Sequence, residues 1–167
     1  KGDHIIDMCA APGGKSIHAA DKMGDYGNVD ARDVSQYKAD LIKENIHRTG
    51  VINVEARVQD ATVYDPDSEQ AADIVIADVP CSGYGVIGKK PEIKDRATPQ
   101  KQEEIVMLQR MILDKAAKYV KPDGTLIFST CTIAREENEE NVLWFLKNYP
   151  YRLESLDPYI PEELHCK

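Results

Sequence analysis

Short apolar runs that alternate with stretches of helical periodicity are the feature that most constrains the fold of this chain. Five runs have the length and composition of β-strands: residues 4–9, 28–34, 53–58, 73–78 and 124–129. Runs that are apolar on both faces are typical of strands buried in a parallel sheet, because helices then cover both sides of it. The sequence therefore predicts an α/β fold with a mostly parallel sheet flanked by helices.

Helical patterns follow the second strand, precede the fifth and close the chain. The first spans residues 35–48, the second runs from Thr98 to a turn at residues 122–124, and the last covers residues 142–149. Thr98 is a favourable N-cap, and the proline after it is favourable at the first helical position. The 167 residues contain no apolar run near the ~20 residues of a membrane span, so we expect residues 1–167 to form a single domain outside the membrane.

A loop of small residues follows the first strand and leads into a helix. Its members are Cys9, Ala10, Ala11, Pro12, Gly13, Gly14 and Lys15, with Ser16 after them. Side chains this small let backbone N–H groups and the N-terminus of the helix approach a ligand closely. Since ligands of open α/β sheets gather at the carboxyl ends of strands, the loop is a candidate cofactor site.

The same loop also resembles a phosphate-binding P-loop, because Gly14-Lys15-Ser16 copies the end of that motif. A P-loop needs its first glycine five residues before Gly14, where this chain has Cys9. Pro12 also removes one of the amides that would bind phosphate. A nucleotidase is therefore the weaker hypothesis.

Two aspartates end the second and third predicted strands. Asp33 lies 19 residues after Gly14, and an acid about 20 residues after a glycine-rich loop binds ribose hydroxyls in dinucleotide folds. Asp60 follows the third strand, where its carboxylate would accept a hydrogen bond from an adenine amino group. Each aspartate alone is well explained as a turn residue, but the pair at matching strand ends favours an adenosine site.

Two cysteines follow neighbouring strands, Cys81 after the fourth and Cys131 after the fifth. A single cysteine is often a small buried hydrophobic residue, but both of these stand in polar surroundings where reactants collect. A thiolate that adds to carbon 6 of a pyrimidine makes carbon 5 able to take a methyl group from a sulfonium. The carbon 5 proton must then be removed and the thiol must leave, and two cysteines with Asp78 supply enough groups for these steps. The residues alone do not decide which cysteine attacks.

The attacking thiol needs a pKa below its ordinary value of about 8.5. A helix that begins just after Thr132 would lower the pKa of Cys131 if its positive end faces the thiol. Glu136 and Glu137 would oppose this effect through their negative charge.

The chain carries 21 Lys and Arg against 29 Asp and Glu, and its net charge of −8 argues against strong binding of nucleic acid by this region. One stretch is locally basic and contains Lys89, Lys90, Lys94, Arg96 and Lys101. It is a candidate RNA contact, although a solvated charged loop explains it equally well. The four cysteines, at positions 9, 81, 131 and 166, suit neither a zinc site nor a disulfide scaffold, so we expect no metal and a reducing cytoplasm.

Three motifs, in this order, make the chain similar to the Sun (Fmu) family of S-adenosylmethionine-dependent RNA 5-methylcytosine methyltransferases. They are residues 7–15, 78–85 and 129–132. Residues 86–94 and 137–139 most resemble the RsmB-like branch of this family, which acts on 16S ribosomal RNA. The resemblance covers nearly the whole chain and implies a Rossmann-like class I methyltransferase fold.

The resemblance implies a cofactor role for three groups of residues. The loop at residues 9–15 would wrap the methionine part of S-adenosylmethionine. Asp33 would bind the ribose and Asp60 the adenine side, while Asp78 would contact the cofactor and help to place the cytosine.

The resemblance also assigns the chemistry. Cys131 would be the nucleophile, and Cys81 would assist proton removal or release of the methylated product. The substrate would be RNA, contacted by Pro80, Lys89 and Lys90, with the target cytosine single-stranded or flipped out because a stacked duplex hides carbon 6.

Family members carry an RNA-recognition domain before this region and a strand after it that closes the sheet. We expect both to be missing here, which makes the chain a catalytic-core fragment. A cofactor-binding or RNA-scaffolding module without catalysis is the alternative hypothesis, and the presence of both cysteines and Asp78 argues against it.

Overall fold

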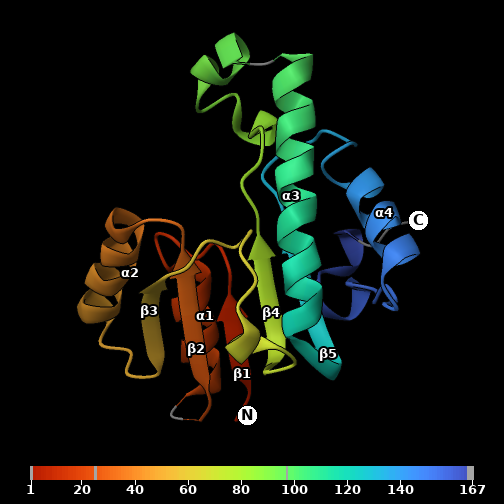
Figure 1. The fold of residues 1–167 in the computed structure, drawn as a ribbon. Coiled ribbons are helices and arrows are strands. Elements are labelled where there is room, and N and C mark those ends of the chain that lie inside the picture. Colours follow the sequence, from red (N-terminus) through yellow and green to blue (C-terminus); the bar gives the residue numbers. More distant parts are fainter. Residues whose placement is uncertain (1, 25, 97, 165–167) are drawn as a thin grey trace.

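A computed structural model of the chain describes residues 2–24, 26–96 and 98–164. Its strands form one sheet in the order β3-β2-β1-β4-β5, in which every neighbouring pair is parallel (Figure 1). The strands are β1 (His4–Asp7), β2 (Asn28–Asp33), β3 (Val54–Val58), β4 (Ala72–Asp78) and β5 (Val120–Ser129). The predicted parallel α/β fold is confirmed, and the described residues after β5 form no further strand.

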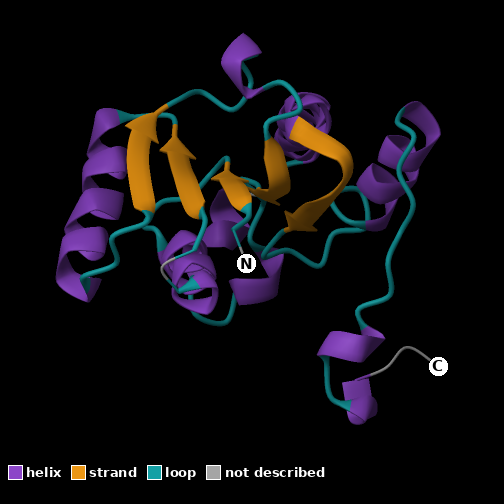
Figure 2. Ribbon diagram, turned by 90° about the horizontal axis from the view of Figure 1, so that it is seen from below, coloured by secondary structure: helices purple, strands orange, loops and turns teal. Residues whose placement is uncertain are grey.

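Helices cover both faces of this sheet, as the view from below shows (Figure 2). They are α1 (Gly14–Met23), α2 (Gln36–Thr49), α3 (Pro99–Tyr119) and α4 (Glu139–Asn148). Side chains of α1 and α2 share one apolar cluster with the sheet, and side chains of α3 and α4 share the other. Short 3-10 turns complete the described chain: η1 (Pro66–Ser68), η2 (Tyr84–Val86), η3 (Pro91–Arg96), η4 (Asp157–Tyr159) and η5 (Glu162–Leu164). None of the helices in the described ranges is long and apolar enough to cross a membrane.

Neighbouring residues of the central strands enter opposite clusters. Ile5 packs with α1 and α2, whereas Ile6 is fully buried on the side of α3. Ile76 and Val75 of β4 repeat this division. Because side chains alternate along a strand, a run that is apolar at every position fills both layers of the core.

Local signals fix both ends of α2 and, as the sequence predicts, the start of α3. Ser35 caps α2 by accepting a hydrogen bond from the Lys38 N–H, and Gly50 ends this helix in the left-handed region with φ 73°. Thr98 caps α3 by accepting from the Lys101 N–H at 3.3 Å, with the predicted proline in the first turn. Each such cap stabilises a helix by about 1 kcal/mol.

The predicted end of α3 and start of β5 are wrong by several residues. The helix ends at Tyr119, and β5 begins at once with Val120, which pairs with Ala72. The expected turn at residues 122–124 instead forms an irregularity inside β5, where Asp123 has φ 64°. The other predicted strand bounds differ from the structure by at most two residues.

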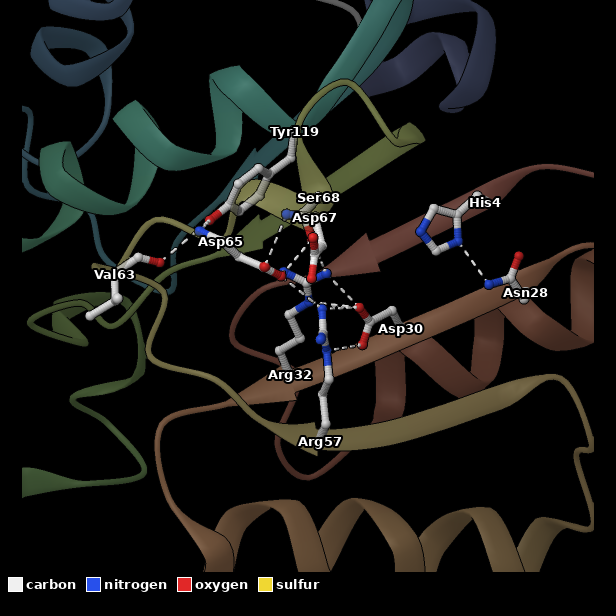
Figure 3. A network of polar contacts seen from close by, with 10 residues as sticks. All are labelled: His4, Asn28, Asp30, Arg32, Arg57, Val63, Asp65, Asp67, Ser68 and Tyr119. Atoms are coloured by element: carbon white, nitrogen blue, oxygen red, sulfur yellow. Dashed lines mark hydrogen bonds and ion pairs between the residues drawn. The ribbon is translucent and has the colours of Figure 1, made fainter.

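A polar network covers the face of β2 on the side of α3 (Figure 3). Arg32 is only 2% exposed and donates to Asp30 Oδ2 from Nε at 2.7 Å and to Ser68 Oγ from Nη2 at 2.7 Å. The Asp65 N–H donates to the Tyr119 hydroxyl at 2.8 Å. These bonds fasten the connection between β3 and β4 to the sheet and to α3, and a buried charge is stable there because it is paired.

Candidate active site at the carboxyl edge of the sheet

The loop after β1 presents backbone amides at the start of α1. Gly13 is the N-cap with φ 103°, a conformation that favours glycine, and no described side chain caps this helix. The N–H groups of Gly14, Lys15 and Ser16 precede the first intrahelical bond, which runs from Ile17 N–H to Gly13 O at 2.9 Å. The predicted loop is therefore an amide-lined cradle at a positive helix end.

Asp7, the last residue of β1, is buried beneath this loop. It is 1% exposed, and its Oδ2 accepts a hydrogen bond from Ser16 Oγ at 2.6 Å. Its other oxygen, Oδ1, is buried without a hydrogen-bond partner among the described residues. Burial raises the pKa of Asp7 from 3.8 to about 6, because a low dielectric disfavours the charged carboxylate.

Asp33 is brought to the same loop. Its Oδ2 accepts from the Ala11 N–H at 3.0 Å, its Oδ1 accepts from the Val34 N–H at 2.8 Å, and Lys38 Nζ lies 2.9 Å from Oδ1. A carboxylate has about four acceptor positions, so Asp33 retains capacity for a ligand hydroxyl. The structure thus joins the ends of β1 and β2 as the sequence predicts.

Asp60 lies two residues beyond β3 and forms a turn. Its Oδ1 accepts from the Thr62 N–H at 2.8 Å and from Thr62 Oγ1 at 2.7 Å. The preceding residue, Gln59, donates its N–H to Asp33 O at 2.9 Å, which keeps this turn beside the end of β2. The side-chain bonds are those of a turn residue, while the position fits the predicted adenosine side.

Asp78 links the loop after β1 to the two strands that precede the cysteines. Lys15 Nζ lies 2.5 Å from its Oδ2, and Ser129 Oγ donates to its Oδ1 at 2.6 Å. Both partners of this ion pair are partly exposed, so the pair contributes little to stability. It does bring the predicted cofactor loop and the predicted catalytic strand ends into one site.

The two candidate cysteines meet. Their Sγ atoms lie 2.7 Å apart, and the Cys131 N–H donates to Cys81 Sγ at 3.2 Å. The hydroxyls of Ser82 and Thr132 also hydrogen-bond at 2.7 Å, which ties the two loops together a second time. Cys131 is exposed and Cys81 is half-buried, so both thiols are beside solvent at the carboxyl edge of the sheet.

The surroundings of Cys81 disfavour its thiolate. Burial raises the pKa of Cys81 from 9.0 to about 11, and the hydrogen bond with Cys131 raises it further toward that value. Cys81 is therefore a protonated thiol near neutral pH and a poor first nucleophile.

The predicted helix just after Thr132 is wrong. The chain there forms a coil and a turn, and α4 begins only at Glu139. Asn138 Nδ2 donates to Thr132 O and to Ala134 O, each at 3.0 Å, and this side-chain bonding replaces a helical turn. The helix end expected to lower the pKa of Cys131 is therefore not where the sequence placed it.

Glu137 is the site residue whose place the sequence missed. The sequence predicts that its charge opposes formation of the Cys131 thiolate. In the structure it is 0% exposed, and its carboxylate accepts a hydrogen bond from the Ser82 N–H, in the Cys81 loop, at 2.9 Å. Burial would raise the pKa of Glu137, but its hydrogen bonds, first of all with Ser82, outweigh burial and lower the pKa. The resemblance at residues 137–139 was the one signal in the sequence that set this glutamate apart from its acidic neighbours.

Cys9 belongs to the loop and is no candidate nucleophile. Its side chain packs against the core on the α3 side. Burial, with the nearby Asp33 and Asp7 charges, raises the pKa of this thiol to about 12. Cys166 lies outside the described residues.

The predicted substrate-contacting residues lie on the segment that leaves β4. Pro80 is exposed, and its carbonyl accepts from Gln109 Nε2 at 2.9 Å. The segment returns to the cysteines at Gly85, whose N–H donates to Cys131 O at 3.1 Å. Lys89 and Lys90 are exposed beyond it, and the segment between β4 and α3 projects past the carboxyl ends of the strands (Figure 1).

This combination of fold and site has a known counterpart. The protein family described as 16S rRNA methyltransferase RsmB/F matches residues 1–163. The chain belongs to this family. The RsmB-like resemblance is thereby confirmed.

A relative named probable ribosomal RNA small subunit methyltransferase B, from Bacillus subtilis (strain 168), is 40% identical over 147 residues, which are 87% of this chain and 33% of the relative. Ribosomal RNA small subunit methyltransferase F of Klebsiella pneumoniae (strain 342) is 36% identical over 92% of this chain and 32% of its own length. The chain thus spans about a third of the curated relatives that it matches.

The crystal structure of NSun6 from Pyrococcus horikoshii superposes with a TM-score of 0.79 at 38% identity, over 87% of this chain and 37% of that one. The expected Rossmann-like methyltransferase fold is confirmed.

Proposed function

We propose that this chain is the catalytic core of an S-adenosylmethionine-dependent enzyme that methylates carbon 5 of a cytosine in RNA, with 16S ribosomal RNA as the substrate. The observation that carries the proposal is the meeting of two thiols, 2.7 Å apart, at adjacent strand ends that Asp78 connects to the loop after β1. Membership of the RsmB/F family supports the methyl transfer and the ribosomal substrate.

The loop after β1 fits S-adenosylmethionine by charge. The cofactor supplies an activated methyl group on a cationic sulfonium, beside an ammonium and a carboxylate. The amides at the start of α1 suit the carboxylate, and the partly exposed carboxylate of Asp78 at a neighbouring strand end suits the cationic groups. Asp33 would hold the ribose, Asp60 the adenine side, and residues 9–15 the methionine part.

Cys131 is the proposed nucleophile. Its thiolate adds to carbon 6 of the cytosine, and the electron pair that moves to carbon 5 takes the methyl group. A base then takes the carbon 5 proton, the electron pair of that C–H bond restores the double bond between carbons 5 and 6, and the bond between carbon 6 and sulfur breaks to regenerate the thiolate. Cys131 is exposed to an incoming base, whereas the raised pKa of Cys81 disfavours it as the attacking group.

Cys81 would act in a later step, either the removal of the carbon 5 proton or the release of the methylated product. It touches Cys131 directly, so it reaches the same pyrimidine ring. Asp78 would help to place the cytosine, and Pro80, Lys89 and Lys90 would contact the RNA around it. An enzyme that depends on two reduced thiols suits a reducing compartment, and we propose the cytoplasm.

Two cysteine variants of the full-length protein test these roles. Tritium transfer from labelled S-adenosylmethionine to ribosomal RNA should be lost in Cys131→Ala. Cys81→Ala should accumulate a covalent RNA adduct that migrates slowly on a denaturing gel. The opposite pattern would exchange the two roles, and cofactor binding without turnover by the unaltered protein would favour a non-catalytic module.

A further inference from the structure

Glu137 presents an isolated carboxylate to three N–H donors from two other parts of the chain. Its Oε2 accepts from the Ser82 N–H at 2.9 Å and from Gln109 Nε2 at 2.8 Å. Its Oε1 accepts from Gln102 Nε2 at 2.7 Å. The ionised carboxylate is stable in this buried position because both of its oxygens accept hydrogen bonds.

The donors cannot easily turn away. The amide of Gln109 also donates to Pro80 O at 2.9 Å, and its Oε1 accepts from Asn141 Nδ2 at 2.7 Å. Both ends of this amide are therefore fixed, and Gln109 is itself 0% exposed. The carboxylate of Glu137 and the carbonyl of Pro80 are held by one rigid side chain of α3.

The position of Glu137 in the sequence makes these contacts unusual. It stands two residues before α4, where an acidic side chain ordinarily serves the first amides of its own helix. Instead it reaches a backbone N–H 55 residues away, next to Cys81. Its own backbone belongs to the segment that follows Cys131.

We propose that Glu137 is a positioning residue that holds the Cys81 loop against the Cys131 loop, and so sets the approach of the two thiols. Its consequence for catalysis rests on the proposed function, whereas the contacts that hold the two loops together do not. Glu137 does not touch the reacting atoms; it acts through the Ser82 peptide.

Three substitutions separate geometry from charge. Glu137→Ala removes every acceptor. Glu137→Asp keeps the charge but is one methylene shorter and withdraws from the Ser82 N–H, and it serves if the alanine variant does not fold. Glu137→Gln keeps a carbonyl oxygen that accepts from the Ser82 N–H. Its new NH2 group faces Gln102, and it can donate to the buried, unpartnered Oε1 of Gln102 once the Gln102 amide rotates by half a turn. Glu136→Ala, at an exposed neighbour, is the matched control.

The first readout does not require activity. Dibromobimane becomes fluorescent when two neighbouring thiols displace both of its bromides, and bridging of Cys81 and Cys131 is read by mass spectrometry, with Cys131→Ala as the blank. We expect the rate of bridging to fall several-fold in Glu137→Ala and Glu137→Asp, and to remain near that of the unaltered protein in Glu137→Gln and Glu136→Ala. Unchanged bridging in folded Glu137→Ala or Glu137→Asp overturns the proposal.

The second readout is the split between kcat and KM in the full-length enzyme. A displacement of about 1 Å in a reacting group costs about 100-fold in rate, so kcat should fall by that order in Glu137→Ala while KM for S-adenosylmethionine stays the same. A rise in that KM with kcat unchanged would also overturn the proposal. If the unaltered enzyme methylates no cytosine, the proposed function fails while the bridging result still decides the role of Glu137.

Discussion

The buried carboxyl group of Asp7 should make the folded chain less stable as the pH rises from about 4 to about 6. Burial raises the pKa of this carboxyl from 3.8 to about 6. At about 1.4 kcal/mol for each pH unit between these values, keeping Asp7 ionised in the folded state costs about 3 kcal/mol. The cost is absent below pH 4, grows as the pH rises toward 6, and is constant above that.

We therefore expect Asp7→Asn to stabilise the fold at neutral pH. Asparagine has nearly the same shape, and its Oδ1 can accept the hydrogen bond from Ser16 Oγ that Asp7 accepts at 2.6 Å. The free energy of unfolding of the variant should exceed that of the unaltered chain by about 3 kcal/mol more at pH 7.5 than at pH 4. Urea titrations followed by the fluorescence of the single tryptophan, Trp144, measure this difference.

Asp114 supplies a control of opposite sign. Burial alone would raise its pKa, but hydrogen bonds from Lys115 and Tyr149 outweigh burial and lower the pKa to about 2. Asp114→Asn should therefore lose stability at neutral pH, and the loss should shrink as the pH falls toward 2. Parallel pH curves for Asp7→Asn and the unaltered chain would refute the reasoning about burial at Asp7.

Three further predictions concern the cysteine site. Gly85→Ala should lower kcat by about 100-fold, because a Cβ at this residue would lie 2.8 Å from Cys131 O and push the Cys131 loop aside; unchanged kcat would show that the loop yields without harm. Since the hydrogen bond with Cys131 raises the pKa of Cys81, Cys131→Ala should speed alkylation of Cys81 by iodoacetamide at pH 8, and a slower reaction would contradict this account. Replacing both Lys89 and Lys90 by alanine should reduce the slope of log affinity for RNA against log salt by about 2, or leave it unchanged if these side chains do not meet phosphate.

The sequence predicts the sheet and its ligand edge because those features depend on local patterns. Runs that are apolar at every position identify the buried strands, and the loop at residues 9–15 and the cysteine loops follow from where those strands end. The meeting of Cys81 with Cys131 also follows from the pattern, since β4 and β5 are adjacent.

The features that the sequence did not predict depend on polar side-chain contacts, several of them with partners far along the chain. The sequence pattern gives Arg32 no role and predicts that Glu137 opposes thiolate formation, yet both are buried and make contacts with residues 33 to 55 positions away. The turn after Thr132 depends on one asparagine that outcompetes a helix through side-chain bonds. Apolar periodicity records none of these pairings, because it reports burial of hydrocarbon and not of polar groups.

The irregularity in β5 acts as a spacer that sets the phase of the strand. Between two paired positions β4 advances from Ala72 to Ile74, while β5 advances from Val120 to Thr125, before the ladder runs in step to Ser129. Removing one residue from this spacer would draw the strand back by about 3.3 Å and turn its side chains over. The position of Cys131 relative to Cys81 therefore depends on the length of the chain at the opposite, amino-terminal edge of the sheet. A deletion there would move the two sulfurs apart without altering either cysteine.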